Sequence, residues 1–395
     1  MRILLATVFN YPHTGGLSTH MTTLKAGLEA LGHEVDTLSF SDLPYYKQQF
    51  FAKGPSMFMN RMAPGKGILL GHKLRAGMLK DLIKKHNAEK PYDLINAQDI
   101  YATFAGLDTG IRTVTTVHGY MTYEAISRGS IRSESPEAHL LQEKEKEAYQ
   151  RTSQVITVDY RIKNYIEQLA GVTGVRVHNF IDVDQFEPQT ERRNELRKKF
   201  GFSTEDLFIF IPRRLTKKNG VIYPAMALPH IHKTCPNAKV IYAGSGEDEA
   251  SVRQICQEKG VTDSVHFLGD IPHEVMKDYY AMSDITMIPS VHSEGVEEAT
   301  SISALEAMGS GVPVIASMVG GLKEIVNHRT NGLLVEERDV QGIADAVAEL
   351  IEKPTFGREL AWNARKKIEE EYSHISAATK YASIYESVLN KAVTY

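Results

Sequence analysis

The run Glu298-Ala-Thr-Ser-Ile-Ser-Ala-Leu-Glu-Ala-Met-Gly-Ser-Gly-Val-Pro-Val-Ile-Ala-Ser317 is the most informative stretch of the 395-residue chain. It predicts a loop, a short helix with Thr300 or Ser301 as N-cap, a stop at the following glycines and then a buried strand. Glu298 therefore precedes the helix, and Glu306 lies near its end. The helix N-terminus between them offers unpaired N–H groups and a positive dipole end, which favours a phosphate or a diphosphate.

The spacing of Glu298 and Glu306 bears on the chemistry that they can perform. At about 1.5 Å of rise per helical residue their backbones lie roughly 12 Å apart, whereas the carboxyl groups of a glycoside-hydrolase pair are roughly 5 to 9.5 Å apart. The two acids are better placed to hold two parts of one long ligand. The alternative is an ordinary exposed helical glutamate at 306, preceded by an acidic loop.

Short aliphatic runs alternate with helical patterns in two successive sets, which predicts an α/β chain with two doubly wound domains and parallel sheets buried on both faces. Ligands would then bind at the carboxyl ends of the strands and between the sheets. We place the domains at residues 1–180 and 181–375, with a terminal helix at about 376–395 that packs either back onto the first domain or on the second domain, which precedes it. The expected strands are Ile3–Val8, Glu34–Ser39, Tyr92–Ala97, Thr113–Val117 and Gln154–Val158, then Leu207–Pro212, Lys239–Ala243, Val265–Leu268, Ile285–Pro289 and Val312–Ser317.

Composition excludes several other classes of protein. The net charge is −4 and the charged fraction is 24%, so nothing in the balance calls for nucleic acid. The two cysteines, Cys235 and Cys256, are too few for a disulfide framework or a zinc cluster, which fits a reducing cytosol. The apolar run at the N-terminus is too short for a signal peptide or a membrane span. We therefore expect a cytoplasmic protein.

The glutamate pair, followed by Ala-Met-x-x-Gly-x-Pro-Val-Ile-Ala and by Val-Gly-Gly-Leu at 319–322, resembles the signature of the retaining glycosyltransferases of glycosyltransferase family 4, which have the two-domain GT-B architecture. The resemblance implies that Glu306 binds the ribose hydroxyls of a nucleotide and that Glu298 lies against the donor sugar. It also implies that the backbone from Ala299 through Thr300 to Ser301 meets the diphosphate. A carboxylate that accepts from two vicinal hydroxyls is the chemistry by which Rossmann enzymes hold a ribose.

Three further motifs acquire roles from the resemblance. The Gly15-Gly16 turn after the first strand lets a ligand approach the backbone at the start of a helix, and it is placed near the donor diphosphate and the acceptor. His118, at the end of a strand, would contact the donor sugar. Gly244 lies in a turn that the family places near the nucleotide. Without the resemblance, a glycine pair is often only a turn and a lone strand-end histidine is more often structural.

The segment Arg213-Arg-Leu-Thr-Lys-Lys-Asn-Gly220 follows a predicted strand. Cations there would neutralise the charge on a departing nucleoside diphosphate without a metal. The family pattern Gly-Arg-Leu-x-x-x-Lys-Gly assigns this role to Arg214, whereas Asn219 occupies the lysine position and Lys218 fits only if the loop shifts by one residue. We expect no metal and no cofactor, and we discount Asp182-Val-Asp184 as a metal motif.

Residues 47–90 form a basic segment with interleaved Phe, Met and Leu side chains. The segment could lie on an anionic membrane surface or hold an acidic acceptor, or it could be a solvated helix with a loop. The resemblance as a whole implies a metal-independent retaining hexosyltransferase that moves a sugar from a nucleotide-diphosphate donor, with UDP the commonest nucleotide in the family, to a hydroxyl-bearing acceptor. A sugar-nucleotide epimerase, a phosphorylase and a non-catalytic relative remain alternatives.

Overall fold

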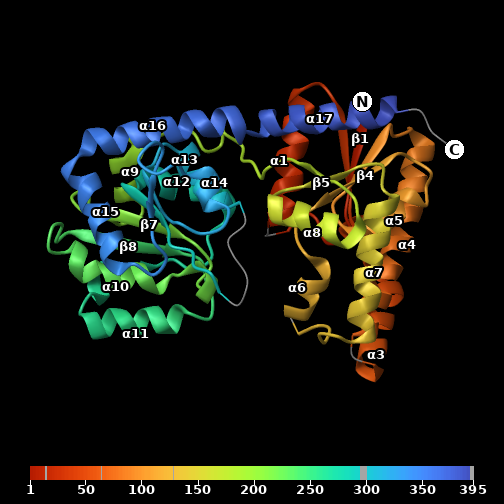
Figure 1. The fold of residues 1–395 in the computed structure, drawn as a ribbon, viewed down its shortest axis with the longest axis horizontal. Coiled ribbons are helices and arrows are strands. Elements are labelled where there is room, and N and C mark those ends of the chain that lie inside the picture. The colour runs from red at the N-terminus through yellow and green to blue at the C-terminus, as the bar shows by residue number, and fades with distance from the viewer. Residues whose placement is uncertain (14–15, 64, 128, 294–299, 392–395) are drawn as a thin grey trace. The chain divides into compact units, whose positions relative to one another are not determined.

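Two parallel six-stranded sheets organise the chain in the computed structural model, which describes residues 1–13, 16–63, 65–127, 129–293 and 300–391 (Figure 1). Unit 1 comprises residues 1–178 and 374–395, and unit 2 comprises residues 179–373. These boundaries fall within two residues of the expected ones at 180 and 375. The α/β fold with two doubly wound domains is confirmed by the strand order and the parallel pairing in both sheets.

In unit 1 the strand order is β2-β1-β3-β4-β5-β6. Because every pairing is parallel, the helices between strands cover both faces, and all five residues of β4 are buried. The elements are β1 (Arg2–Ala6), α1 (Gly16–Ala30), β2 (Glu34–Leu38), η1 (Phe40–Asp42), α2 (Tyr45–Lys47), η2 (Gln48–Lys53), α3 (Gly54–Met62), α4 (Lys66–Glu89), β3 (Leu94–Ala97), α5 (Ile100–Leu107), β4 (Thr113–Val117), α6 (Met121–Ser127), α7 (Pro136–Arg151), β5 (Val155–Thr157), α8 (Tyr160–Ala170), β6 (Val175–Arg176) and α17 (His374–Asn390).

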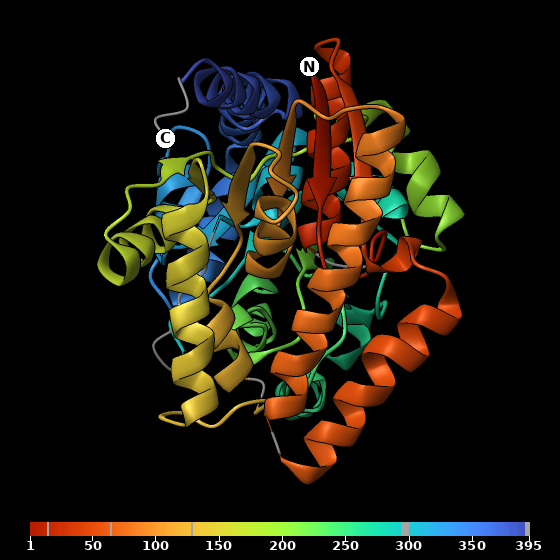
Figure 2. The same cartoon turned by 90° about the vertical axis from the view of Figure 1, so that its right-hand side faces the viewer.

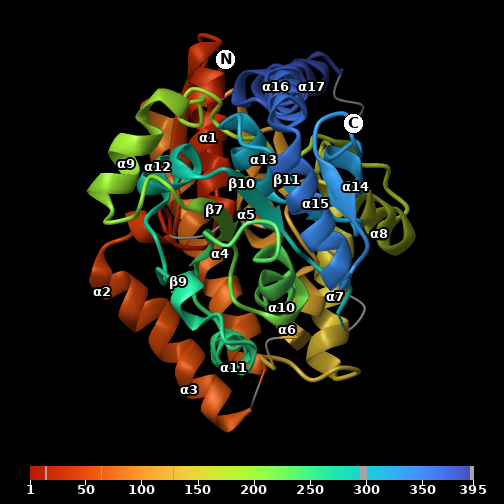
Figure 3. The same cartoon turned by 90° about the vertical axis from the view of Figure 1, so that its left-hand side faces the viewer.

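In unit 2 the strand order is β12-β11-β10-β7-β8-β9. Of these strands, Figure 3 labels β7, β9, β10 and β11. Two clusters of buried side chains fill the space on either side of this sheet. The elements are η3 (Thr190–Arg192), α9 (Arg193–Lys199), β7 (Leu207–Pro212), η4 (Lys217–Asn219), α10 (Ile222–Ile231), β8 (Ala238–Ala243), α11 (Glu249–Lys259), η5 (Thr262–Ser264), β9 (Val265–Phe267), α12 (His273–Met282), β10 (Ile285–Ile288), α13 (Ile302–Gly309), β11 (Val314–Ser317), α14 (Leu322–Ile325), β12 (Leu333–Val335), α15 (Val340–Glu352) and α16 (Pro354–Glu371).

All ten expected strands are present, and their ends match the expected ones or differ by at most two residues. Two further strands were not expected from the sequence. These are β6 and β12, each at one edge of its sheet and only two or three residues long. No helix in the described ranges is long and apolar enough to cross a bilayer.

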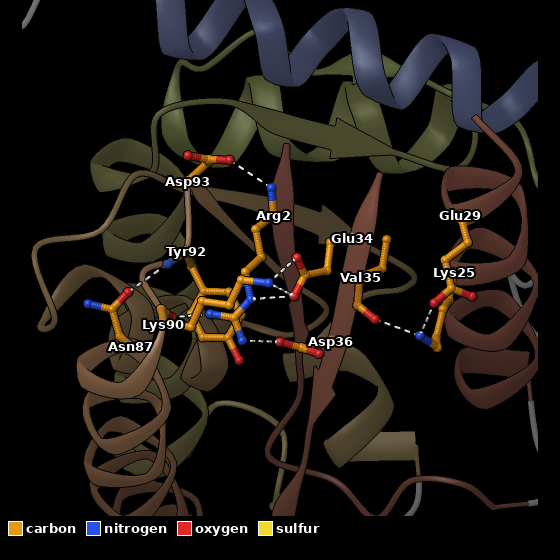
Figure 4. Close-up of polar contacts among 10 residues, drawn as sticks. All are labelled: Arg2, Lys25, Glu29, Glu34, Val35, Asp36, Asn87, Lys90, Tyr92 and Asp93. Atoms are coloured by element: carbon orange, nitrogen blue, oxygen red, sulfur yellow. Dashed lines mark hydrogen bonds and ion pairs between the residues drawn. The ribbon is translucent and has the colours of Figure 1, made fainter. Parts of the chain in front are cut away.

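A network of charges fixes the amino-terminal ends of β1 and β2 (Figure 4). The Arg2 guanidinium donates to Glu34 Oε1 at 3.1 Å and to Asp36 Oδ2 at 2.5 Å, and it lies 4.1 Å from the centre of the Tyr92 ring. Lys90, just after α4, reaches the Glu34 carboxylate at 2.6 Å. The network holds the start of β1 beside β2 and beside the segment that enters β3.

Helix α17 belongs with unit 1 although it is the last helix of the chain. Asn96 Nδ2 in β3 donates to Tyr385 Oη at 2.6 Å, and the Arg112 guanidinium donates to the carbonyl oxygen of Val388 at 2.7 Å. The helix also runs against α1 at Gly27, where a side chain would meet the backbone of α17. These contacts make α17 part of the unit 1 core.

The α1–α17 contact yields a prediction about stability. A Cβ at Gly27 would lie 2.5 Å from the carbonyl oxygen of His374 and 2.9 Å from Ala378 Cβ, whereas a Cβ at Gly77 in α4 has nothing within 4 Å. Overpacking of this kind costs about 1 to 3 kcal/mol. Gly27→Ala should therefore lower the midpoint of urea unfolding, and Gly77→Ala should raise the free energy of unfolding by up to about 1 kcal/mol through helix propensity. Shifts of the same sign would contradict this packing.

Candidate functional site

The strand order of each sheet reverses at one point, and α/β proteins bind ligands outside the carboxyl ends of the strands at such points. In unit 1 the reversal falls between β1 and β3, and in unit 2 it falls between β7 and β10. The segments that leave β7 and β10 carry Arg213 and Ser290. The candidate donor site of unit 2 is built from these segments and from the N-terminus of α13.

Arg213 connects the three parts of this site. Its Nη1 donates to Ser301 Oγ at 3.1 Å, and its Nη2 donates to Ser290 Oγ at 3.2 Å and to Asn219 Oδ1 at 2.5 Å. In addition, Ser303 Oγ in the first turn of α13 donates to the carbonyl oxygen of Pro212 at 2.9 Å. These bonds hold the start of α13 at the carboxyl end of β7.

Glu306 lies in the last turn of α13 and is only 3% exposed, so it is not the exposed helical glutamate of the alternative interpretation. Tyr280 Oη donates to its Oε2 at 2.9 Å, and His273 Nε2 lies 2.7 Å from its Oε1. The hydrogen bond to the carboxylate raises the pKa of His273 above 6.5, and burial together with the negative charge of Glu306 raises that of Tyr280. The two donors fix the carboxylate, whose remaining lone pairs can accept from a ligand.

In the basic loop after β7, some side chains are packed inside the protein and others are exposed to solvent. Asn219, in the lysine position of the family pattern, is buried and donates through Nδ2 to the carbonyl oxygen of Arg214 at 2.7 Å. The side chains of Arg214 and Lys218 are exposed, and neither forms a hydrogen bond or an ion pair with another described residue. The structure thus leaves Arg214 and Lys218 available to a ligand, together with the neighbouring exposed Lys217.

Of the other donor-site residues predicted in unit 2, the structure describes Thr300, Ser301 and Gly244. Ser301 is the N-cap of α13, and both it and Thr300 are buried. Glu298 and Ala299 lie outside the described residues. Gly244 has a φ of +136°, and its N–H donates to the carbonyl oxygen of Gly269 at 2.7 Å, so this N–H is already occupied within the turn.

The discounted Asp182-x-Asp184 motif forms a turn. Asp182 Oδ1 accepts hydrogen bonds from the backbone N–H groups of Asp184 at 3.0 Å and Gln185 at 3.2 Å. A side chain that bonds its own backbone two residues on is an Asx-turn, which accounts for an aspartate at position 182.

In unit 1, His118 lies at the carboxyl end of β4 beside a cavity of about 650 Å³. Gln98 Nε2 donates to the carbonyl oxygen of Asn96, so its Oε1 faces His118 Nε2 at 2.9 Å and accepts from it. His118 Nδ1 then carries a lone pair. Burial lowers the pKa of His118 to about 4, so the ring is neutral near pH 7 and can accept a hydrogen bond from a hydroxyl group.

The Gly15-Gly16 turn is described only in part. Gly16 begins α1, and a Cβ there would meet no atom within 4 Å. Gly15 lies outside the described residues. At Gly16 the described structure therefore shows space near the start of α1 but no steric need for glycine.

Three residues of the unit 2 site were missed as functional candidates. Tyr280 and His273 position Glu306 from α12, and no motif in the sequence marks them. Arg213 stands where the family pattern has its first glycine, and the sequence alone gave it no role. Its signal was the pairing of an extra arginine with Asn219 in the lysine position, since these two side chains bond each other.

Comparison with known proteins matches both halves of the chain to glycosyltransferase families. The family described as Glycosyltransferase Family 4 matches residues 14–185, and the family described as Glycosyl transferases group 1 matches residues 192–367. An uncharacterized glycosyltransferase of Methanocaldococcus jannaschii is 29% identical over 395 residues, which is 98% of each chain. A GDP-mannose-dependent phosphatidylinositol monomannoside mannosyltransferase of Mycobacterium tuberculosis is 34% identical over 173 residues, which is 43% of this chain and 45% of the relative.

Among solved structures, the Anabaena protein HepE in complex with UDP has a TM-score of 0.69 and 18% sequence identity, and the match covers 98% of this chain and 100% of that one. This similarity concerns the fold. Together with the two family matches it shows that the chain belongs to the group 1 and family 4 glycosyltransferases, enzymes of the hexosyltransferase type with the GT-B fold that transfer a sugar from a nucleotide-sugar.

Proposed function

We propose that the enzyme is a retaining, metal-independent glycosyltransferase that uses a UDP-sugar. The observation that carries the proposal is the buried Glu306 carboxylate, held by Tyr280 and His273 at 2.9 and 2.7 Å in the helix whose N-terminus Arg213 fixes. A preorganised carboxylate, a helix N-terminus and free cations match the ribose and the diphosphate of one nucleotide. UDP is proposed because it is the commonest nucleotide of the family that the sequence resembles.

In this proposal the ribose hydroxyls donate to Glu306, and the diphosphate meets Arg214, Lys218 and the N–H groups at the start of α13. The two cations take the place of a metal by stabilising the negative charge that builds on the leaving group. Glu298 and His118 keep the role that the resemblance implies, which is to orient the donor sugar.

Retention of configuration follows if the acceptor attacks from the face that the nucleotide leaves. The bond between the anomeric carbon and the phosphate oxygen breaks, the acceptor oxygen bonds to that carbon, and the departing phosphate takes the acceptor proton. The positions of Arg214 and Lys218 favour this course because they stabilise the same phosphate.

The function is tested by incubating the protein with a panel of nucleotide sugars and measuring nucleotide release with and without candidate hydroxyl acceptors. A transferase releases nucleotide faster when an acceptor is present. An epimerase interconverts nucleotide sugars without an acceptor, a phosphorylase requires phosphate, and a non-catalytic relative releases nothing. Proton NMR of the product determines whether configuration is retained.

We also propose that unit 1 contacts a membrane through the helical arm, defined as residues 45–62. Elements α2, η2 and α3 form one helix in this arm, which lies beside α4 (Figure 2). The side of the arm that faces α4 carries small or polar side chains. Ser56 Oγ donates to the carbonyl oxygen of Gly67 at 2.6 Å, and Gly65 N–H donates to Asn60 Oδ1 at 2.8 Å.

The outer side of the arm is apolar. Half of the large apolar side chains that are exposed in the described chain lie here, so the arm is reversed relative to a helix that buries its apolar side in a protein core. Their exposures run from 37% to 75%. They are Tyr45, Tyr46, Phe50, Phe51, Met57, Phe58, Met59 and Met62.

The positive charge on and near the arm favours binding to an anionic surface. Residues 43–80 contain no aspartate or glutamate but seven lysines and arginines, among them Lys47 and Arg61 on the exposed side of the arm. Each basic side chain close to an anionic bilayer contributes about 1 kcal/mol to binding. The arm therefore has the composition of an interfacial helix.

The donor site gives a prediction for nucleotide binding. Wild-type protein should bind UDP more tightly than GDP or ADP in calorimetry without added metal. Arg214→Gln should raise the Kd for UDP about 10-fold, since a hydrogen bond to a charged group contributes about 1.5 to 3 kcal/mol. Lys218→Gln tests whether Lys218 takes the place of the lysine in the family pattern. Lys217→Gln, a change at the neighbouring residue of the same turn, is its control. Equal Kd values for these two variants would remove Lys218 from the site, and tighter GDP binding would replace the proposed nucleotide.

The pair of Glu306 and His273 gives a pH prediction. The pKa of His273 in the folded protein lies above its ordinary value of 6.5, so the pair contributes its full stability below pH 6.5 and loses it as the pH rises through the raised pKa. Glu306→Gln should lower the His273 pKa to 6.5 or below, because both effects of Glu306 that raise it are lost and burial, which lowers it, is then opposed only by the smaller effect of the Glu274 charge. NMR titration measures this, with His266 as the control: burial lowers its pKa, and the substitution should not move it. An unchanged His273 titration would contradict the pairing.

The arm gives a prediction for membrane binding. In flotation assays the protein should bind vesicles that contain anionic phosphatidylglycerol more tightly than pure phosphatidylcholine vesicles, and added salt should weaken the binding. The triple variant Phe50→Ser, Met57→Ser, Phe58→Ser should lose more than about 10-fold in affinity through lost apolar burial. Trp362→Ser, an exposed aromatic change in unit 2, is the matched control. Equal losses in both variants, or no preference for anionic vesicles, would count against the arm.

A further inference from the structure

The cavity of unit 1 lies at the carboxyl ends of β1, β3 and β4, on the side of the sheet reversal between β1 and β3. Its volume of about 650 Å³ falls within the range of roughly 300 to 1,000 Å³ that small-molecule sites occupy. Apolar side chains make up part of its wall, among them Phe9, Leu17, Ile68 and Met121. The cavity is formed by unit 1 alone, so its chemistry can be analysed without unit 2.

Arg75 of α4 is the sole lysine or arginine among the described residues that line the cavity. Its guanidinium lies 4.5 Å from the centre of the Phe40 ring, and its Nε is buried without a hydrogen-bond partner. No hydrogen bond or ion pair joins Arg75 to another described residue. A guanidinium that is half-buried in this way has donors to satisfy, and an anion satisfies them best.

Asp99, which also lines the cavity, does not satisfy Arg75. Its carboxylate accepts four hydrogen bonds: from Thr7 Oγ1 at 2.8 Å and from the backbone N–H groups of Val8 at 2.9 Å, Tyr101 at 3.0 Å and Ala102 at 2.8 Å. Asp99 is the N-cap of α5, and two of these bonds are to backbone N–H groups in the first turn of that helix. Its charge moderates the field at Arg75 but leaves the donors of Arg75 open.

His72 lies three residues before Arg75 on α4 and lines the same cavity. Its ring stacks on Tyr101 with 4.9 Å between centroids, and its Nδ1 is buried without a partner. Burial and the positive charge of Arg75 lower the pKa of His72 to about 4, so the ring is neutral near pH 7. It therefore adds a hydrogen-bonding atom beside Arg75 without adding charge.

We propose that this cavity binds the acceptor and that the acceptor carries a carboxylate or phosphate group, which Arg75 and His72 bind. The inference rests on the proposed transferase function for the reaction itself. Arginine binds both groups through two parallel N–H donors. The hydroxyl group that receives the sugar would lie toward His118 on another wall of the cavity, so one molecule needs both an acid and a hydroxyl.

The anion site can be tested without knowing the acceptor. Inorganic phosphate and citrate serve as probes, compared with chloride at equal ionic strength, in the presence of saturating UDP so that the donor site is filled. Both probes should raise the melting temperature of the wild-type protein. Arg75→Gln should weaken phosphate binding about 10-fold or more, because it removes a charged bidentate donor. Arg75→Lys keeps the charge and should recover part of the response.

The matched control is Lys73→Gln, which removes an exposed positive charge two residues away on the same helix and should leave the phosphate response intact. The proposal is overturned if wild-type protein shows no response beyond that to chloride, or if Arg75→Gln responds as the wild type does. Failure of UDP to bind would count against the donor proposal alone, since the anion comparison between variants still decides the role of Arg75.

Acceptor assays then identify the source of the acid. Sugar release from the donor is measured with a sugar phosphate in solution, with phosphatidylinositol in vesicles, and with the free sugar and inositol as neutral counterparts. Acidic acceptors should stimulate release at least about 10-fold more than their neutral counterparts, and Arg75→Gln should abolish that difference while the Kd for UDP stays unchanged. Equal stimulation by neutral and acidic acceptors would overturn the proposal.

Discussion

Parallel pairing of every strand is the constraint on which both candidate sites depend. A parallel strand must be followed by a crossover, so each sheet is covered by helices and its carboxyl-end loops gather at one edge. The reversal of strand order then separates two neighbouring crossovers, between β1 and β3 in one unit and between β7 and β10 in the other. Each separation exposes strand ends where side chains can meet a ligand without competing with the backbone hydrogen bonds of the sheet.

The two units use buried charge in different ways. In unit 2 the charges are satisfied within the protein: Arg213 bonds three side chains, and Glu306 has Tyr280 and His273 as donors. Removing one partner from such a set leaves a buried charge exposed to a low dielectric, which costs more than the bond itself contributes. In unit 1 the acid Asp99 is satisfied but Arg75 is not. A satisfied network fixes a geometry, whereas an unsatisfied donor in a cavity is consistent with a ligand as its partner.

The sequence was sufficient for the strands of both sheets because fully buried parallel strands are continuous aliphatic runs, as in β4 and β7. It was insufficient for β6 and β12, whose two or three residues carry too little pattern and whose position depends on the neighbouring strand. Local motifs likewise pointed to Glu306, Ser301 and the basic loop. They did not reveal that Glu306 is buried or that Tyr280 and His273 hold it, since those partners come from α12 and are joined to it only by the fold. Nor did they reveal that Arg213 donates to Asn219, because this hydrogen bond depends on how the loop folds.

Helix α4 connects the two proposals about unit 1. Its first turns pack against the arm through Gly67 and Gly71, where a side chain would collide with Ser56 or Asn60, and the same turns contribute Ile68, His72 and Arg75 to the cavity wall. An arm bound to an anionic surface would therefore bring that wall close to lipid headgroups. Arg75 would be attracted to the same surface as Lys47 and Arg61, but its burial over Phe40 restricts it to an acid that enters the cavity. The arm is thereby suited to bind the surface without selecting a molecule, while the cavity selects one acidic headgroup or solute by shape.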